Sequence, residues 1–309
     1  MQTLVLGLFN GLTYGMLLFL MAAGLTLVFS MLGVLNFSHA AFYTLGAYFA
    51  YTAAQLLGLG FWAGLVAAPL CCGLLGAFVE RFGLRQVLQY GMLGPLLLTF
   101  GLNIVIVELV GLIWGKTPVA YAVPHALDTP LISLYGIDYS AYRAFTFAVT
   151  LVVLVALFLV LKGTRIGTIV RASLSYPDMV NALGHDLPRL RTMVFAAGSA
   201  LAGLAGALSG NLLGTEPGMA DQLGAILMIV IVVGGLGSLA GAFLASLLIG
   251  VLQTLAASTG LAWSDLLPPL HGMAGALEQP ISRFAPLIPF AIVLVVLGVR
   301  PRGLLGTRH

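Results

Sequence analysis

The most charged segment of the chain reads KGTRIGTIVRASLSYPDMVNALGHDLPRLR (162–191), and long apolar runs flank it on both sides. Its basic residues are Lys162, Arg165, Arg171, Arg189 and Arg191. A basic loop between two apolar runs is typical of the cytosolic face of a membrane protein. The segment therefore predicts a chain that crosses a bilayer repeatedly and keeps this loop inside the cell.

The middle of this loop, Tyr176–Gly184, has the pattern of a short amphipathic helix. Pro177 and Asp178 suit its first turn, and Gly184 suits its end. A short surface helix between two spans could be gripped by a cytosolic partner. An ordinary positive-inside loop, required by topology alone, would explain the same residues. The stretch by itself leaves both interpretations open.

Composition also places the chain in a bilayer. Of its 309 residues, 60% are hydrophobic and 7% are charged, whereas soluble domains have roughly 25% charged residues. The net charge of +3 comes from residues near predicted span ends, which leaves no basic patch for nucleic acid. The predicted fold class is an all-α, polytopic transmembrane helical bundle that forms a single domain over residues 1–309.

Apolar runs separated by polar loops predict about nine spans, or about eight to ten if two interrupted runs are counted differently. The runs are 4–32, 43–57, 61–79, 92–114, 144–161, 192–213, two crossings within 223–254, and 287–299. Ten of the thirteen basic residues then lie on the cytosolic side, and the N-terminus lies outside. The clean apolar run 144–161 is expected to face lipid, and the small residues of 192–213 indicate close helix packing.

Polar residues interrupt the chain where the first apolar run ends. Asn36, Ser38 and His39 lie at this break. Backbone can leave a helix at membrane depth only where protein or a water-filled cavity satisfies it, and broken helices commonly build transport sites. We therefore expect these three residues near a translocation pathway. The alternative is a polar turn at the membrane surface.

A glycine cluster, 234–241, interrupts the run 223–254 in a similar way. It lacks the lysine and the strand context of a phosphate-binding loop, so a discontinuous helix fits it better. Its surroundings, GGLGSLAGAF (234–243), faintly echo GVLNFSHAAF (33–42) at the first break. We therefore expect a second set of pathway residues opposite the first: Gly234, Gly235, Gly237 and Ser238.

The sequence shows little catalytic chemistry. It has no His-x-x-x-His motif, no clustered acid pair and no nucleotide motif, so we expect no catalytic residue, metal site or cofactor. Glu108 is the only acid inside an apolar run; it is either buried with a partner or wet near the outer surface. The predicted spans therefore contain few ionisable side chains that could form an ion-coupled relay. If the protein pumps, its energy must come from another subunit.

Three separated motifs resemble the branched-chain amino acid ABC transporter permeases of the H-type subunit. The stretch NGLTYGMLLFLMAAGLTLVFSMLGVLNFSHAAFYTLGAY (10–48) is similar to the opening of that family. Two later signatures resemble VIVVGGLGSLAGAFLASLLIGVLQTL (230–255) and VRPRGLLG (299–306). The chain departs from the family at Ala40-Ala41, where the family usually has Gly-Glu. The family also serves urea, short amides and some carboxylic or aromatic acids, which are the alternative substrates.

The resemblance implies a non-catalytic permease subunit of an ATP-driven importer in the bacterial inner membrane, for branched-chain or related hydrophobic amino acids. Its implied partners are a homologous second permease, two cytosolic ATP-binding subunits and a periplasmic substrate-binding protein. The loop 162–192 would then couple ATP use to transport. The implied coupling residues are Tyr176, Pro177, Asp178, Met179, Asn181, Ala182, Leu183 and Gly184. A stand-alone channel or secondary carrier is the alternative from a different class.

Overall fold

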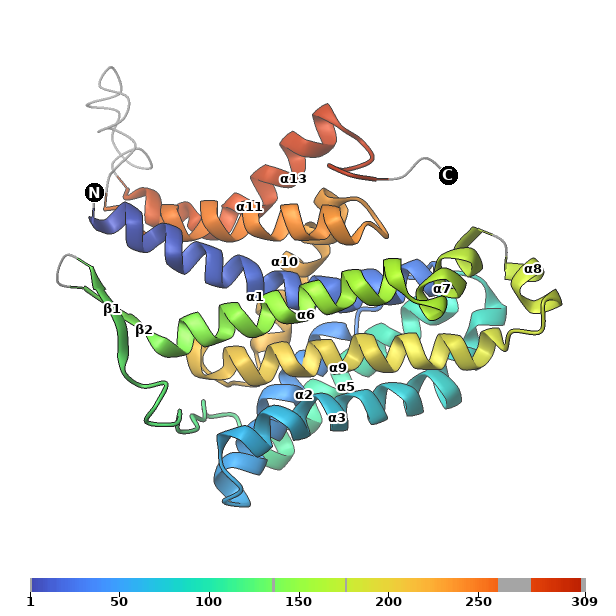
Figure 1. The fold of residues 1–309 in the computed structure, drawn as a ribbon, viewed down its shortest axis with the longest axis horizontal. Helices are drawn as coiled ribbons and strands as arrows, with labels where there is room; N and C mark the ends of the chain where they lie inside the picture. Colours follow the sequence, from blue (N-terminus) through green and yellow to red (C-terminus); the bar gives the residue numbers. More distant parts are fainter. Residues whose placement is uncertain (1, 135–136, 176, 261–278, 307–309) are drawn as a thin grey trace.

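The computed structural model describes residues 2–134, 137–175, 177–260 and 279–306. In these ranges the chain is a helical bundle with one small hairpin, as the composition predicts. Figure 1 shows α1, α6, α9 and α11 lying across the molecule in similar orientations, with the hairpin at one end and α7 and α8 at the other. Because α7 and α8 belong to the basic loop, their end of the bundle is the cytosolic one.

The helices and strands follow the chain in this order: α1 (Gln2–Leu32), α2 (His39–Tyr51), α3 (Phe61–Val79), α4 (Arg85–Val87), α5 (Leu93–Trp114), β1 (Pro130–Leu134), β2 (Ile137–Ser140), α6 (Ala141–Gly163), α7 (Arg165–Ser175), α8 (Pro177–Ala182), α9 (Leu187–Leu213), α10 (Met219–Gly234), α11 (Leu239–Ser258) and α13 (Ile288–Val299). Short turns of other helix types extend α2, link α3 to α5 and precede α13; they are η1 (Thr52–Leu56), η2 (Glu80–Leu84), η3 (Leu88–Tyr90) and η6 (Ile281–Leu287). The strands pair antiparallel.

Seven helical stretches are long and apolar enough to cross a membrane, as judged from length and composition over the described residues. They contain α1, α3, α5, α6, α9, α11 and α13. Two further apolar helices are shorter, since α2 has 13 residues and α10 has 16, against the roughly 20 that a crossing needs. These nine segments correspond to the predicted runs, and the two short helices follow chain reversals, as expected for discontinuous segments.

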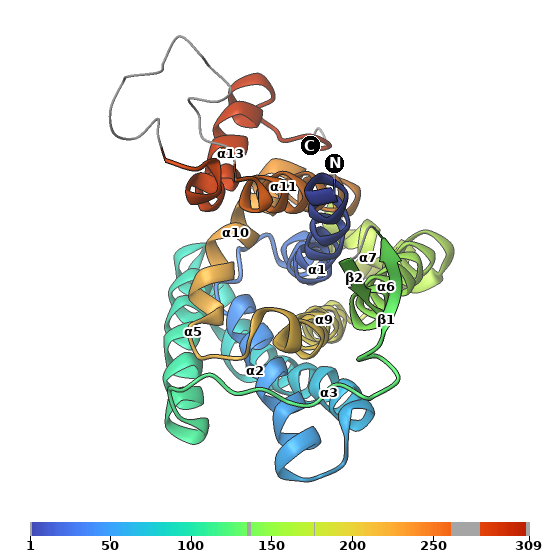
Figure 2. The same cartoon turned by 90° about the vertical axis from the view of Figure 1, so that its left-hand side faces the viewer.

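Helix α9 packs in the middle of the bundle, against α1, α2 and α3 (Figure 2). Lipid provides little hydrophobic force between helices, so close approach depends on small residues. Gly46 of α2 lies against the backbone of Gly203 in α9, and a methyl group at Gly203 would come 2.7 Å from Cys72 Sγ in α3. A second close contact joins α1 to α11, where a methyl group at Gly11 would come 2.7 Å from Val251 Cα. The expected packing role of the small residues in α9 is confirmed.

A buried polar cluster joins the end of α3 to the first turn of α9. The carboxylate of Glu80 is fully buried, and its Oε2 accepts from Thr192 Oγ1 at 2.5 Å and from Arg85 Nη2 at 3.3 Å. Arg85 also donates to the carbonyl of Pro188 at 2.9 Å. A buried carboxylate needs such partners, because desolvation is costly without them. The cluster therefore fixes the cytosolic ends of α3 and α9 together.

Replacing Gly46 with alanine should lower the melting temperature of the protein. The new methyl group would overlap the backbone of Gly203, which cannot move without separating α2 from α9; overpacking of this kind costs about 1–3 kcal/mol. Gly101→Ala in α5 is the control, since nothing lies within 4 Å of the added methyl group there. Both variants would be compared by tryptophan fluorescence during heating in detergent, and equal melting temperatures would contradict close packing at Gly46.

Replacing Glu80 with alanine should also destabilise the fold, because Arg85 and Thr192 lose their shared acceptor. A hydrogen bond to a charged group contributes about 1.5–3 kcal/mol, and the lower end is expected because the Arg85 side chain is 37% exposed. Glu108→Ala is the matched control. Glu108 pairs with Lys116 at 4.0 Å, and both side chains are well exposed, so its loss should change stability by less than about 1 kcal/mol. A melting temperature lowered equally by both substitutions would refute the structural role of Glu80.

Candidate functional site

The break between α1 and α2 is satisfied by side chains inside the bundle. Asn36 Oδ1 accepts from the Ser38 amide at 3.1 Å and from the Ser38 hydroxyl at 2.6 Å. The Phe37 amide donates to Thr99 Oγ1 of α5 at 3.3 Å. Asn36, Ser38 and Thr99 are all buried. These contacts replace the hydrogen bonds that water would supply to the same groups at a membrane surface.

His39 fixes the first residue of α2 against the middle of α1. Its imidazole is fully buried, and Nε2 donates to the Met21 carbonyl at 3.0 Å, because a carbonyl can only accept. Gly24 makes room for the ring, since a methyl group there would come 3.0 Å from it. These contacts give Ser38 and His39 an architectural role. Neither lines one of the three cavities described below, and a role for them in transport stays a prediction.

Asn36 differs from these neighbours because it also lines a cavity. The cavity has a volume of about 260 Å³ and lies between α2, α5 and α10. Asn36 Nδ2 and Asn103 Oδ1 are buried there and have no hydrogen-bond partner among the described residues, and Asp221 of α10 lines the same cavity. Unpaired buried polar groups are costly and call for an explanation, such as a polar solute or water. Of the first predicted set, Asn36 is the residue placed to contact such a solute.

The glycine cluster forms the turn between α10 and α11. Gly235 and Gly237 have φ values of +101° and +80°, a conformation that suits glycine. The Leu305 amide donates to the Gly234 carbonyl at 3.1 Å, and Ser238 Oγ accepts a backbone amide in the first turn of α11 at 3.1 Å. The turn is therefore packed against the C-terminal segment, and it lines none of the three cavities described here. Its predicted place in the pathway stays a prediction.

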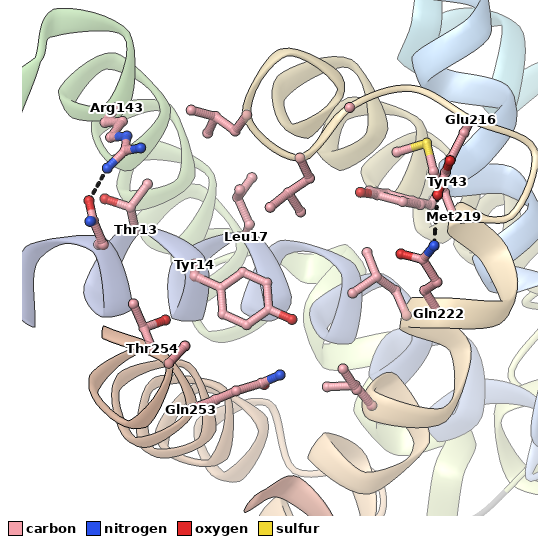
Figure 3. A pocket seen from close by; sticks show the side chains of 17 residues that line it. Thr13, Tyr14, Leu17, Tyr43, Arg143, Glu216, Met219, Gln222, Gln253 and Thr254 are labelled. Atoms are coloured by element: carbon pink, nitrogen blue, oxygen red, sulfur yellow. Dashed lines mark hydrogen bonds between the residues drawn. The ribbon is translucent and has the colours of Figure 1, made fainter. Parts of the chain in front are cut away.

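A larger cavity lies among α1, α2, α6, α9, α10 and α11 and has a volume of about 470 Å³. Figure 3 shows Arg143 on one side of it and Glu216 with Gln222 on another, with Tyr14 between them. Gln222 Nε2 donates to Glu216 Oε1 at 2.7 Å, and Arg143 donates to Asn10 Oδ1. Sequence reasoning missed this cavity because its lining residues come from six helices, and no spacing within one segment reveals it.

Glu108 lies near the outer end of α5, where the structure decides between the two alternatives. Its side chain is 63% exposed and pairs with Lys116. Both residues line a small cavity of about 230 Å³ beside Glu216 and Pro217. Glu108 is therefore an exposed acid near the outer loop and has no place in a buried relay.

The predicted short helix in the basic loop is present as α8 (Pro177–Ala182). Met179 and Leu183 are 62% and 73% exposed, and Gly184 ends the turn with a φ of +85°. Tyr176 lies outside the described residues. The loop thus presents two large apolar side chains to the cytosolic side, and the described part of the chain leaves both of them exposed.

A second helix in the loop, α7, connects α8 to the spans. Val170 of α7 packs in one buried cluster with Val180, Leu187 at the start of α9, and Met31 at the end of α1. Ser173 Oγ donates to Met31 Sδ at 3.1 Å. The base of the loop is therefore firmly attached to α1 and α9, while the apolar side chains of its tip remain exposed.

Comparisons with known proteins agree with this architecture. Residues 7–297 match the family model described as the permease component of the branched-chain amino acid transport system. The high-affinity branched-chain amino acid transport system permease protein BraD of Pseudomonas aeruginosa is 29% identical over 97% of this chain and 94% of its own length. LivH of Escherichia coli K12, described in the same words, is 27% identical over the same shares.

The similarity extends beyond bacteria. A probable branched-chain amino acid transport permease protein LivH of Methanocaldococcus jannaschii is 26% identical over 95% of this chain and 90% of its own length. No solved structure matches the chain significantly. The family model covers nearly the whole sequence, and it covers both short helices and the basic loop. The chain is therefore a multi-pass membrane protein of the branched-chain amino acid transport permease family.

Proposed function

We propose that this chain is a non-catalytic permease subunit of an ATP-driven importer for branched-chain or related hydrophobic amino acids in the bacterial inner membrane. It would act with a homologous second permease, two cytosolic ATP-binding subunits and a periplasmic substrate-binding protein. The family relationship supports the class of transporter. The structural observation that carries the proposal is the exposed apolar tip of the basic loop, formed by Met179 and Leu183 of the α8 turn.

When a partner buries exposed leucine and methionine side chains of a cytosolic loop, the free energy of the complex is lowered. The tip is short, and its base is packed on Met31 of α1 and Leu187 of α9. A cytosolic subunit that grips the tip would therefore displace two spans directly. Such a transfer of motion is what an importer needs if its own spans carry no ion-coupling group.

The cavity that contains Asn36 and Asn103 supports a translocation role for the face formed by α2, α5 and α10. Asp221 on this face is exposed in the single chain. Polar groups at membrane depth usually face a protein interior or a water-filled cavity, because lipid would not satisfy them. We infer that the second permease covers this face and that substrate passes between the two chains.

Leu183→Asp should abolish the stimulation of ATP hydrolysis by leucine-loaded binding protein in the reconstituted complex. The charge would keep the tip from entering an apolar groove, and the cytosolic subunits would lose their grip. The measurement is the rate of phosphate release with and without leucine. Leu305→Asp is the control, because Leu305 is a partly exposed leucine of the C-terminal segment, away from the loop.

The outcomes separate the parts of the proposal. A response to leucine in the wild type and in Leu305→Asp, but not in Leu183→Asp, supports both the transporter class and the coupling role. An unchanged response in Leu183→Asp would refute the coupling role. A complex that hydrolyses ATP but never responds to leucine would remove the amino-acid substrate, and failure of any ATP-binding subunit to associate would refute the importer.

Asn103→Ala should reduce leucine uptake by proteoliposomes without lowering the melting temperature. Among the described residues the Oδ1 atom has no partner, so the fold loses no hydrogen bond to this atom. A passing polar solute would lose a contact of about 1–1.5 kcal/mol, which lowers uptake roughly tenfold. The neighbouring Ile104→Ala is the control, since Ile104 is 51% exposed and absent from the cavity lining. Equal uptake by both variants would contradict a pathway at this face.

A further inference from the structure

Arg143 occupies a position that neither topology nor helix stability explains. It lies in the first turn of α6, at the end of the bundle opposite the cytosolic loop. The positive-inside rule disfavours a basic residue beside a span on this side. A cation is also unfavourable in the first turn of a helix, where the helix dipole is positive. A different requirement must therefore favour arginine here.

The guanidinium group of Arg143 lines the cavity of about 470 Å³, where it donates to the neutral side chain of Asn10. Among the described residues, no carboxylate forms a salt bridge with it. A guanidinium has five N–H donors in a planar fork that matches a carboxylate. The helix dipole of α6 adds to the same positive potential. The Arg143 guanidinium thus gives the cavity a positive charge that no salt bridge compensates among the described residues, together with N–H donors that a ligand could use.

The rest of the cavity has features that suit a small amphiphile. Its volume falls within the range of about 300–1,000 Å³ that is usual for ligand sites. Leu17, Leu223 and Ile226 give it an apolar lining. Glu216 lies on a different side from Arg143 (Figure 3), and Gln253 Oε1 is buried with no hydrogen-bond partner in the part of the chain that the structure describes. The potential therefore runs from positive at Arg143 to negative at Glu216, which would orient a zwitterion with an apolar side chain.

We propose that this cavity binds a small molecule through its carboxylate, which Arg143 holds by charge-assisted hydrogen bonds. The inference rests on the proposed function for its choice of leucine as the probe. It places a binding step inside this single chain, in addition to the pathway between two permeases. The carboxylate is the group that determines binding. The apolar side chain of the molecule lies against the leucine and isoleucine side chains of the cavity wall.

The test measures binding of leucine to the complete transporter complex in nanodiscs without the binding protein, which would otherwise impose its own specificity. Saturation-transfer NMR detects weak binding, with dissociation constants up to the millimolar range. The competitors are 4-methylpentanoate, which keeps the carboxylate, and leucinamide, which lacks it. Arg143→Gln should weaken leucine binding at least about tenfold, as expected for a charge-assisted contact, and Arg143→Lys should restore part of it.

Arg283→Gln is the matched control. Arg283 also lies on the outer side and donates to a neutral amide, Gln279 Oε1, at 2.7 Å, but it does not line the cavity. Binding that depends on Arg143, tolerates Arg283→Gln and yields to 4-methylpentanoate supports the proposal. Melting temperatures of all variants exclude simple misfolding, and Arg143→Lys gives a second measure if Arg143→Gln proves unstable.

Three results would overturn the inference: no saturation transfer to leucine or to 4-methylpentanoate, equal binding by the wild type and Arg143→Gln, or equal competition by leucinamide. None of them touches the proposed function, which is judged from ATP hydrolysis stimulated by leucine-loaded binding protein. Conversely, Arg143-dependent binding of 4-methylpentanoate without any leucine response in hydrolysis would keep the carboxylate site and remove the amino-acid substrate.

Discussion

The break between α1 and α2 has to satisfy its backbone inside a bilayer, and the surrounding structure depends on how it does so. The hydrogen bond from His39 to the Met21 carbonyl and the bonds within Asn36–Ser38 provide what water cannot. They start α2 at the middle of α1, with Gly24 leaving room for the imidazole. Because α2 starts there, it meets α9 at Gly46, where only small residues allow the contact.

The same constraint links the cytosolic loop to the centre of the bundle. The loop packs on Met31, ten residues after Met21 on the same continuous helix, α1. At its other end the loop leads into α9, where Thr192 donates to Glu80, the residue that directly follows α3. The loop is therefore in contact with α1 and α9, and through Thr192 and Glu80 with the end of α3. Helix α2, which begins beside the cavity that contains Asn36, is held to α1 by His39.

The residue pattern could predict much of this arrangement, because bilayers impose strong rules on sequence. Apolar runs identify the long helices, and basic residues orient them. The pattern Pro177…Gly184 identifies α8. Helix α7 is less evident in the sequence because charged residues interrupt it, although apolar positions 166, 169 and 170 repeat at helical spacing. The hairpin β1–β2 was missed for a similar reason, since its segment is short and rich in turn residues.

Tertiary contacts could not be predicted in the same way. The sequence indicated that Asn36, Ser38 and His39 interrupt a helix, but it could not show that Ser38 and His39 bond inward while Asn36 retains an unpaired amide group. It likewise could not show that the C-terminal segment covers Gly234. These contacts are formed by side chains from segments that are distant in the sequence, so the pattern of residues within one segment cannot predict them. Arg143 is the clearest case, since its cavity exists only when six helices are assembled.

Helix α10 is the wall that the two principal cavities share. Leu223 and Ile226 line the outer cavity, whereas Gly224 and Leu227 line the cavity beside Asn36. Helix α10 therefore borders both the cavity that contains Arg143, inside the chain, and the polar cavity beside Asn36. Its 16 residues are too few to anchor it across the bilayer, and glycines flank it at Gly218 and Gly235. Together with the shorter α2, whose Tyr43 also lines the outer cavity, α10 is therefore among the helices of that cavity least fixed by the membrane itself. Its position depends on Gly224 against α2 and on the C-terminal segment against the turn that follows.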